Sequence, residues 1–142
     1  MSDGWWREAT ASGLVSIENH SWDHNHPAAS WTCQRDQRKG PFDTIETEEE
    51  CAAEVEGAAR YIGEQTGRWP VLFAYPGGTA SAYLREQYFP ERGERHRTLA
   101  AFAADGGFVT RASSRWFVPR FVCGAHWRDP AELERILRGA RA

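Results

Sequence analysis

Cysteine is scarce in this sequence, and the few cysteines are widely spaced. Cys33, Cys51 and Cys123 form no CxxC pair, so neither a disulfide framework nor a structural zinc ribbon is predicted. Long apolar runs are also missing, and no stretch approaches the length of a membrane span. The start, MSDGWWREAT, is polar and acidic and lacks the charged start and apolar run of a secretory signal. As written, the chain is therefore expected to be cytoplasmic, unless an upstream segment has been lost.

Basic charge is limited as well. The net charge is −3, Lys39 is the only lysine, and charges of both signs are spread along the chain. Because no basic stripe could follow a row of phosphates, nucleic acid is not an expected partner. The 142 residues, 41% of them hydrophobic, are enough for one domain with a real core but few for a complete α/β barrel. We therefore expect residues 1–142 to form a single domain, truncated at its N-terminus.

Apolar periodicity and capping residues predict an alternation of helices and strands. Ser2 or Asp3 is expected to cap the first helix, and Thr47 with Glu50 has the spacing of a capping box. The first expected element is a short helix that carries Trp5, Trp6 and Ala9 and is ended by Gly13. It is followed by a strand over 14–19, a long loop over 28–46, a helix over 48–65, a strand over 71–75, helices near 80–88 and 97–104, and strands over 108–110 and 117–122. A last helix begins at Asp129 and Pro130 and turns Leu133, Ile136 and Leu137 inward. This order indicates an α/β protein with a largely parallel sheet.

Three polar segments each follow a predicted strand directly. They are residues 20–26, residues 75–78 and residues 123–127. Because chemistry gathers at the carboxyl ends of the strands in such folds, we expect these segments to form one site.

His20 and His24 are the candidate metal ligands. They are four residues apart, so on a single helical turn both imidazoles could face one zinc, copper or nickel ion. A histidine pair at this spacing is more often a surface or capping feature. Its position at the end of a strand, beside Asp23 and His26, favours a metal site. Since catalytic zinc usually has three protein ligands, at least one more must come from elsewhere.

Three segments resemble the polysaccharide deacetylase (NodB-homology) family. The run IENHSWDHNHP is similar to the family's second motif, FAYPGG to its third, and FVPRFVCGAHW to the Pro-Arg strand near its C-terminal end. The likeness extends from Trp5 to Leu137. It implies a partial, distorted (β/α) barrel of the polysaccharide deacetylase type that lacks its first strand or strands.

The resemblance also implies roles for individual residues. His20 and His24 would bind zinc or another divalent transition metal, and His126 would be a general acid. Tyr75, Pro76 and Gly78 would line the substrate groove. Arg120 would orient an active-site carboxylate, although a structural ion pair is an equal alternative. The tryptophans that suit stacking on sugar rings, of which one or two are expected to touch substrate, are Trp22, Trp31, Trp116 and Trp127.

The sequence departs from the family pattern in three ways. The first motif, which carries a metal-binding aspartate and a catalytic base, has no counterpart and would have to lie upstream of Met1. Glu18 stands where the family commonly has glycine, and Ala74 where many members have arginine. The nearby aspartates that could substitute are Asp23, Asp36 and Asp43.

Three functions remain open at this point. The first is a metal-dependent hydrolase that removes N-acetyl groups from an amino-sugar polysaccharide, whose full-length relatives are in some cases exported. The second is a non-catalytic remnant of the same fold that binds carbohydrate or a partner, and the third is a hydrolase of small amides. A sheet without its first strand would leave an exposed edge, so dimers are also expected.

Overall fold

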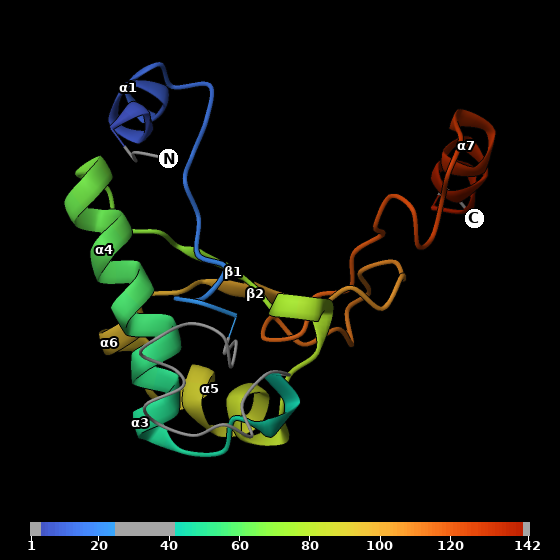
Figure 1. The fold of residues 1–142 in the computed structure, drawn as a ribbon. Coiled ribbons are helices and arrows are strands. Elements are labelled where there is room, and N and C mark those ends of the chain that lie inside the picture. Colours follow the sequence, from blue (N-terminus) through green and yellow to red (C-terminus); the bar gives the residue numbers. More distant parts are fainter. Residues whose placement is uncertain (1–3, 25–41, 141–142) are drawn as a thin grey trace.

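Two short parallel strands form the centre of the fold, β1 (Leu72–Ala74) and β2 (Ala100–Phe102) (Figure 1). The structure, a computed structural model, describes residues 4–24 and 42–140. Asn19 forms a parallel bridge to Phe73 of β1, and Val118 forms one to Phe102 of β2. Four extended segments therefore lie side by side in the order of the sequence, all parallel. The predicted α/β class is confirmed.

The strand predicted over 14–19 is reduced to one bridging residue. The Glu18 carboxylate accepts hydrogen bonds from the amides of Val71 and Leu72 at 2.9 and 2.8 Å. The Glu18 side chain thus accepts hydrogen bonds from amides that would donate to backbone carbonyls if residues 14–18 formed a paired strand. Leu14 is 90% exposed. The prediction of a strand was wrong for residues 14–18.

The helix predicted near 97–104 was also wrong. The helix in this region is α6 (Gly93–His96), which ends where Arg97 adopts a φ of 56°. The following alanine-rich run forms β2, and Ala101 and Ala103 are completely buried. Short apolar runs do not distinguish helix from buried strand, and close packing against β1 overrides the helical propensity of alanine.

The two late strands are not formed either. In the segment 117–122 only Val118 makes a bridge, and residues 108–110 lie outside the sheet. Phe108 is 43% and Val109 64% exposed. Their β-branched and aromatic side chains suggested strands, but no neighbouring strand among the described residues buries them.

The predicted helix over 48–65 is confirmed as a continuous rod of three parts, α3 (Glu48–Cys51), a π-helical segment η2 (Ala52–Glu56) and α4 (Gly57–Thr66). The Thr47 and Glu50 capping box is present. Gly67 ends the rod with a φ of 76°, a conformation that costs glycine little.

The first helix, α1 (Trp5–Ala11), packs against α4, with the rings of Trp6 and Tyr61 6.2 Å apart. Gly4 occupies its N-cap position without a side-chain bond. The proposed caps Ser2 and Asp3 lie outside the described residues, and so do residues 28–41 of the predicted loop. The described end of that loop contains a single 3-10 turn, η1 (Phe42–Thr44).

The core lies between the strands and the helices that follow them. After β1 come a 3-10 turn, η3 (Pro76–Gly78), a π-helical segment, η4 (Leu84–Tyr88), and α5 (Phe89–Glu91). Phe73 is at the centre, with its ring 5.3 to 6.0 Å from three other aromatic rings. The core residues are Phe42, Ile45, Cys51, Val55, Phe73, Tyr75, Leu84, Tyr88, Phe89 and Ala101.

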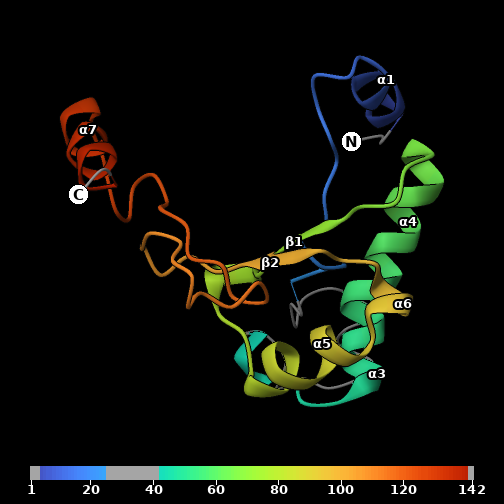
Figure 2. The ribbon, with the colours of Figure 1, turned by 180° about the vertical axis from the view of Figure 1, so that it is seen from behind.

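The last helix, α7 (Pro130–Gly139), begins as predicted, because Asp129 accepts a hydrogen bond from the Glu132 amide at 2.8 Å. It stands apart from the strands and the other helices (Figures 1 and 2), and its last residue, Gly139, lies beside the ring of Phe108. None of its residues is buried, and Leu137 is 58% exposed. The predicted inward packing was therefore wrong for Leu137, whereas Leu133 and Ile136 are half-buried. Within the described ranges, no helix has the length and apolar character needed to cross a membrane.

Candidate metal centre and substrate groove

Asn19 fixes the start of the histidine segment. Its backbone amide donates to the Leu72 carbonyl at 3.1 Å, and its carbonyl accepts from the Ala74 amide at 2.9 Å. Its side chain donates to the Val55 carbonyl at 2.8 Å and accepts from the Ser21 amide at 2.9 Å. Asn19 is only 2% exposed. Apart from a polar residue at the end of an apolar segment, nothing in the sequence indicated this role.

The π-helical segment η2 supplies the other side of this anchor. Its wider turn brings the Val55 carbonyl to the Asn19 side chain, and the buried Glu54 carboxylate accepts from the Asp23 amide at 3.5 Å. Single π-helical turns within α-helices are often associated with functional sites. Here η2 contacts the histidine segment at both Asn19 and Asp23.

His20 and His24 lie together, although not on a helical turn. Ser21 and His24 have φ values of 73° and 63°, so the chain forms a tight loop, which the His24 amide closes by donating to Ser21 Oγ at 2.9 Å. The two imidazole rings are 4.5 Å apart between centroids and nearly perpendicular, at 85°. The helical turn assumed from the spacing was wrong, but the two rings are adjacent.

The tautomer of His20 suits metal binding. Its Nδ1 lies 2.7 Å from the carbonyl oxygen of Ala74, the last residue of β1. Because a carbonyl only accepts, Nδ1 carries the proton and Nε2 carries the lone pair. Metal-ligating histidines are commonly oriented in this way.

The described residues therefore provide two candidate metal ligands, His20 and His24. Within residues 4–24 and 42–140, no three His, Cys, Asp or Glu side chains gather closely enough to hold an ion. His26 and Asp36 lie outside these ranges. A complete set needs at least one further ligand besides His20 and His24.

Tyr75 belongs to the core rather than to an open groove. Its side chain is 0% exposed, and its hydroxyl donates to the Trp116 carbonyl at 2.8 Å. Burial raises the pKa of this phenol well above its ordinary value, so it remains a hydrogen-bond donor. Alternation along β1 places Tyr75 on the same side as Phe73, but the sequence could not show which side of the strand faces the core.

The residues after Tyr75 form part of a cavity. Pro76 and Gly78 are buried, whereas Gly77 is exposed. A Cβ on Gly78, whose φ is 76°, would lie 2.3 Å from the Cβ of Ala104. Glycine thus lets the end of β1 pass close to the segment that follows β2. The cavity has a volume of about 430 Å³ and is lined by Asp43, Gly77, Gly78, Thr79, Ala80, Arg85, Ala104, Asp105 and Phe117.

His126 lies against the segment that follows β2. Its Nδ1 accepts from the Val122 amide at 2.9 Å, so Nε2 carries the proton. A Cβ on Gly106 would lie 2.4 Å from that Nε2, so only glycine leaves room for the ring. Arg120, which was expected to orient a carboxylate, donates from Nε to the Ala103 carbonyl at 2.6 Å.

The candidate tryptophans lie in different surroundings. Trp22 is 44% exposed and lines a second cavity, beside His20. Trp116 stacks on Phe89, with ring centroids 5.6 Å apart. The backbone of Trp127 forms an isolated parallel β-bridge with that of Cys123. Trp31 lies outside the described residues.

A sequence model of the family described as polysaccharide deacetylase matches residues 4–88. No curated protein matches.

Solved structures with a similar fold include IcaB from Ammonifex degensii, with 21% identity and a TM-score of 0.64 over 99% of this chain and 53% of that one. A de-N-acetylase from Aggregatibacter actinomycetemcomitans has 16% identity and a TM-score of 0.63 over 96% and 53% of the two chains. The BpsB deacetylase domain from Bordetella bronchiseptica has 17% identity and a TM-score of 0.61 over 85% and 48%. The chain spans about half the length of these structures. The family match covers the histidine segment, η2 and the cavity-forming glycines, and the chain belongs to the polysaccharide deacetylase family.

Proposed function

We propose that this chain carries part of the active site of a metal-dependent hydrolase that removes N-acetyl groups from an amino-sugar polysaccharide. The observation that carries the proposal is the histidine pair. His20 and His24 lie together at the carboxyl end of β1, and the Ala74 carbonyl leaves His20 Nε2 with its lone pair. The family match and the de-N-acetylase among the similar structures support this reaction and substrate class.

In this proposal each group has a distinct task. Zinc, or another divalent transition metal, held by His20 and His24 would supply Lewis-acid polarisation of the acetamide carbonyl. The Ala74 carbonyl orients the His20 ring, and Asn19 anchors the backbone next to it. The cavity beside Gly77 and Gly78 accommodates the neighbouring part of the substrate, because glycine allows a ligand close to the backbone.

His126 is proposed as the proton donor to the leaving amine. In the present tautomer Nε2 carries the only ring proton. To act as an acid, the ring must take a second proton on Nδ1, which would displace the Val122 amide from it. Protonation of His126 would thus be coupled to a local movement of the 122–126 turn.

The four parallel segments support a partial (β/α) barrel. Asn19, β1, β2 and Val118 follow one another in space as they do in sequence, which is the arrangement of strands in such a barrel.

The test is acetate release from oligomers of N-acetylglucosamine in the presence of zinc. The chain contains no adjacent pair of aspartates, so on its own it is expected to act close to the detection limit. Fusion to an upstream segment that carries such a pair should restore turnover, because general-base catalysis alone contributes about 10² to 10⁴-fold. His20→Ala in the fused form should remove the activity again. Equal turnover with and without His20 would reject the proposal.

A second candidate is carbohydrate binding without catalysis. The aromatic cavity beside His20, which Trp22 lines, favours it. Binding of the oligomer by the fused protein without acetate release would select this alternative. A small amide as substrate would be indicated if acetate were released from monomers alone.

A further inference from the structure

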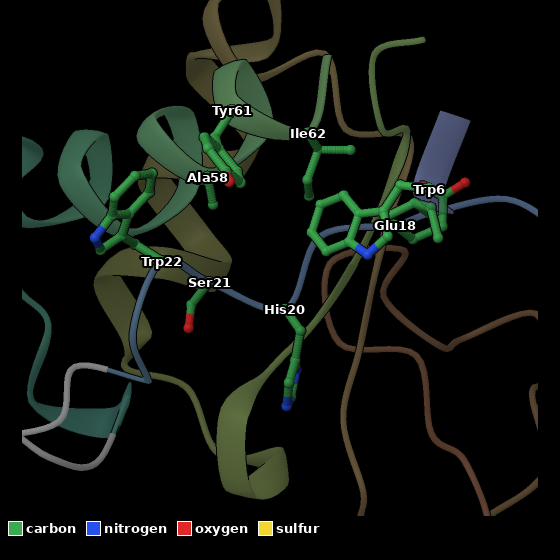
Figure 3. A pocket seen from close by; sticks show the side chains of 9 residues that line it. Trp6, Glu18, His20, Ser21, Trp22, Ala58, Tyr61 and Ile62 are labelled. Carbon is green, nitrogen blue, oxygen red and sulfur yellow. The ribbon is translucent and has the colours of Figure 1, made fainter. Parts of the chain in front are cut away.

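A cavity of about 500 Å³ lies between α1, the histidine segment and α4 (Figure 3). It is separate from the cavity at Gly77 and Gly78 and is not formed by the family motifs alone. Its walls come from elements far apart in the sequence. The lining residues are Trp6, Ile17, Glu18, His20, Ser21, Trp22, Ala58, Tyr61 and Ile62.

Three aromatic side chains form much of this lining. The rings of Trp6 and Tyr61 are 6.2 Å apart at 80°, and those of Tyr61 and Trp22 are 5.7 Å apart at 79°. The nearly perpendicular rings present both faces and edges around the cavity. Trp22 remains 44% exposed, so part of the aromatic lining reaches the surface of the molecule.

Polar residues also contribute to the lining of this cavity. The Glu18 carboxylate is held by the amides of Val71 and Leu72, so it is a fixed acceptor at one side. Ser21 and His20 also belong to the lining, although the Ser21 hydroxyl and the His20 imidazole point away from the three rings in Figure 3. Pockets for small ligands combine such an apolar lining with a few placed polar groups, and this volume is within their usual range.

These features suit a sugar ring better than a purely apolar ligand. A pyranose has an apolar face of C–H groups that stacks on an aromatic ring, and hydroxyl groups at its rim that donate to a carboxylate. Because His20 is shared between this cavity and the histidine pair, a polymer could occupy both at once.

We infer that the cavity formed by Trp6, Trp22 and Tyr61 is a subsite for one sugar ring of an N-acetylated amino-sugar chain, next to the ring that lies at the histidine pair. The inference rests on the proposed function for its substrate class. The subsite itself needs no metal. Binding and acetate release therefore report on it and on the proposed function separately.

The test measures binding of a short N-acetylglucosamine oligomer to the whole chain, in the presence of EDTA, by saturation-transfer NMR and tryptophan fluorescence. Trp6→Ala and Trp22→Ala should each weaken binding by about fivefold or more, the size expected for a lost aromatic contact. Trp5→Ala is the matched control, because Trp5 is adjacent in α1, 53% exposed and not in the lining. Circular dichroism verifies that each variant is folded.

The outcomes are distinguishable. Equal binding by the Trp5, Trp6 and Trp22 variants would overturn the subsite. The subsite would also be overturned if the Trp6 and Trp22 variants changed in self-association but not in oligomer binding, because the cavity would then be a protein interface. Loss of binding in those two variants, with no acetate release from any fused form, would support the subsite and reject the proposed function.

Discussion

At the scale of single residues, Asn19 holds the candidate metal centre in place. Replacing it with alanine removes two side-chain bonds, one of them to the Val55 carbonyl. We expect Asn19→Ala to lower the free energy of unfolding by about 1 to 3 kcal/mol, because a buried carbonyl loses its donor. Urea denaturation measures this. Ser16→Ala, an exposed change on the same segment, should have little effect, and equal stabilities would contradict the assigned role.

His96 should make the fold sensitive to acid. It is completely buried. Burial lowers its pKa from the ordinary 6.5, although its hydrogen bond to the Phe89 carbonyl and the charge of Glu56 oppose this. The unfolded chain therefore takes up the proton more readily than the folded one. This contribution to stability is complete above pH 6.5 and is lost as the pH falls toward the lower, folded-state pKa.

Unfolding free energies from pH 7.5 to 5 measure this effect. The wild type should lose more stability over this range than His96→Gln. A pH dependence unchanged by the substitution would show that other groups control it. His24→Gln, an exposed change, should retain the wild-type dependence.

The sequence predicted the neighbourhood of the site better than the direction of each side chain. His20 was placed at a strand end, and it lies there because Asn19 bridges to β1. Tyr75 was also placed at a strand end, but its ring is in the core. Alternation along a strand tells which residues share a face, and it does not tell which face is covered.

At the scale of elements, local signals predicted the capped helices and the strand β1, but they missed β2. The rod over 48–66 begins at a capping box and ends at a glycine. In contrast, β2 is a three-residue alanine-rich strand, and its burial beside β1 was not readable from sequence. The π-helical turn of η2 left no sequence signal.

The capping box gives a prediction for the rod. Thr47 Oγ1 accepts from the Glu50 amide at 3.3 Å, and the Glu50 carboxylate accepts from the Thr47 amide at 3.1 Å. Thr47→Ala should lower the free energy of unfolding by about 1 kcal/mol. Thr79→Ala, at an exposed turn, is the control. The same loss from both substitutions in urea denaturation would argue against a specific cap.

At the scale of the whole molecule, apolar side chains remain exposed on the first extended segment. Leu14 is 90% and Val15 46% exposed, and residues 14–18 form no strand on either side. The dimer predicted from an exposed sheet edge stays a prediction. Sedimentation velocity should show concentration-dependent association that Leu14→Lys with Val15→Lys reduces, because charge disfavours edge pairing. A monomer at all concentrations would contradict it.

The most direct test of the central claim is zinc binding by the histidine pair. Titration calorimetry should detect weak binding to the whole chain, because the described residues supply two ligands. Combining His20→Ala with His24→Ala should weaken zinc binding by more than about tenfold. Changes to residues that only support a metal ligand already cost about tenfold, so losing both ligands should cost more. Cys123→Ser, an exposed cysteine outside the pair, should leave binding unchanged. Unchanged zinc affinity in the double histidine variant would contradict the account.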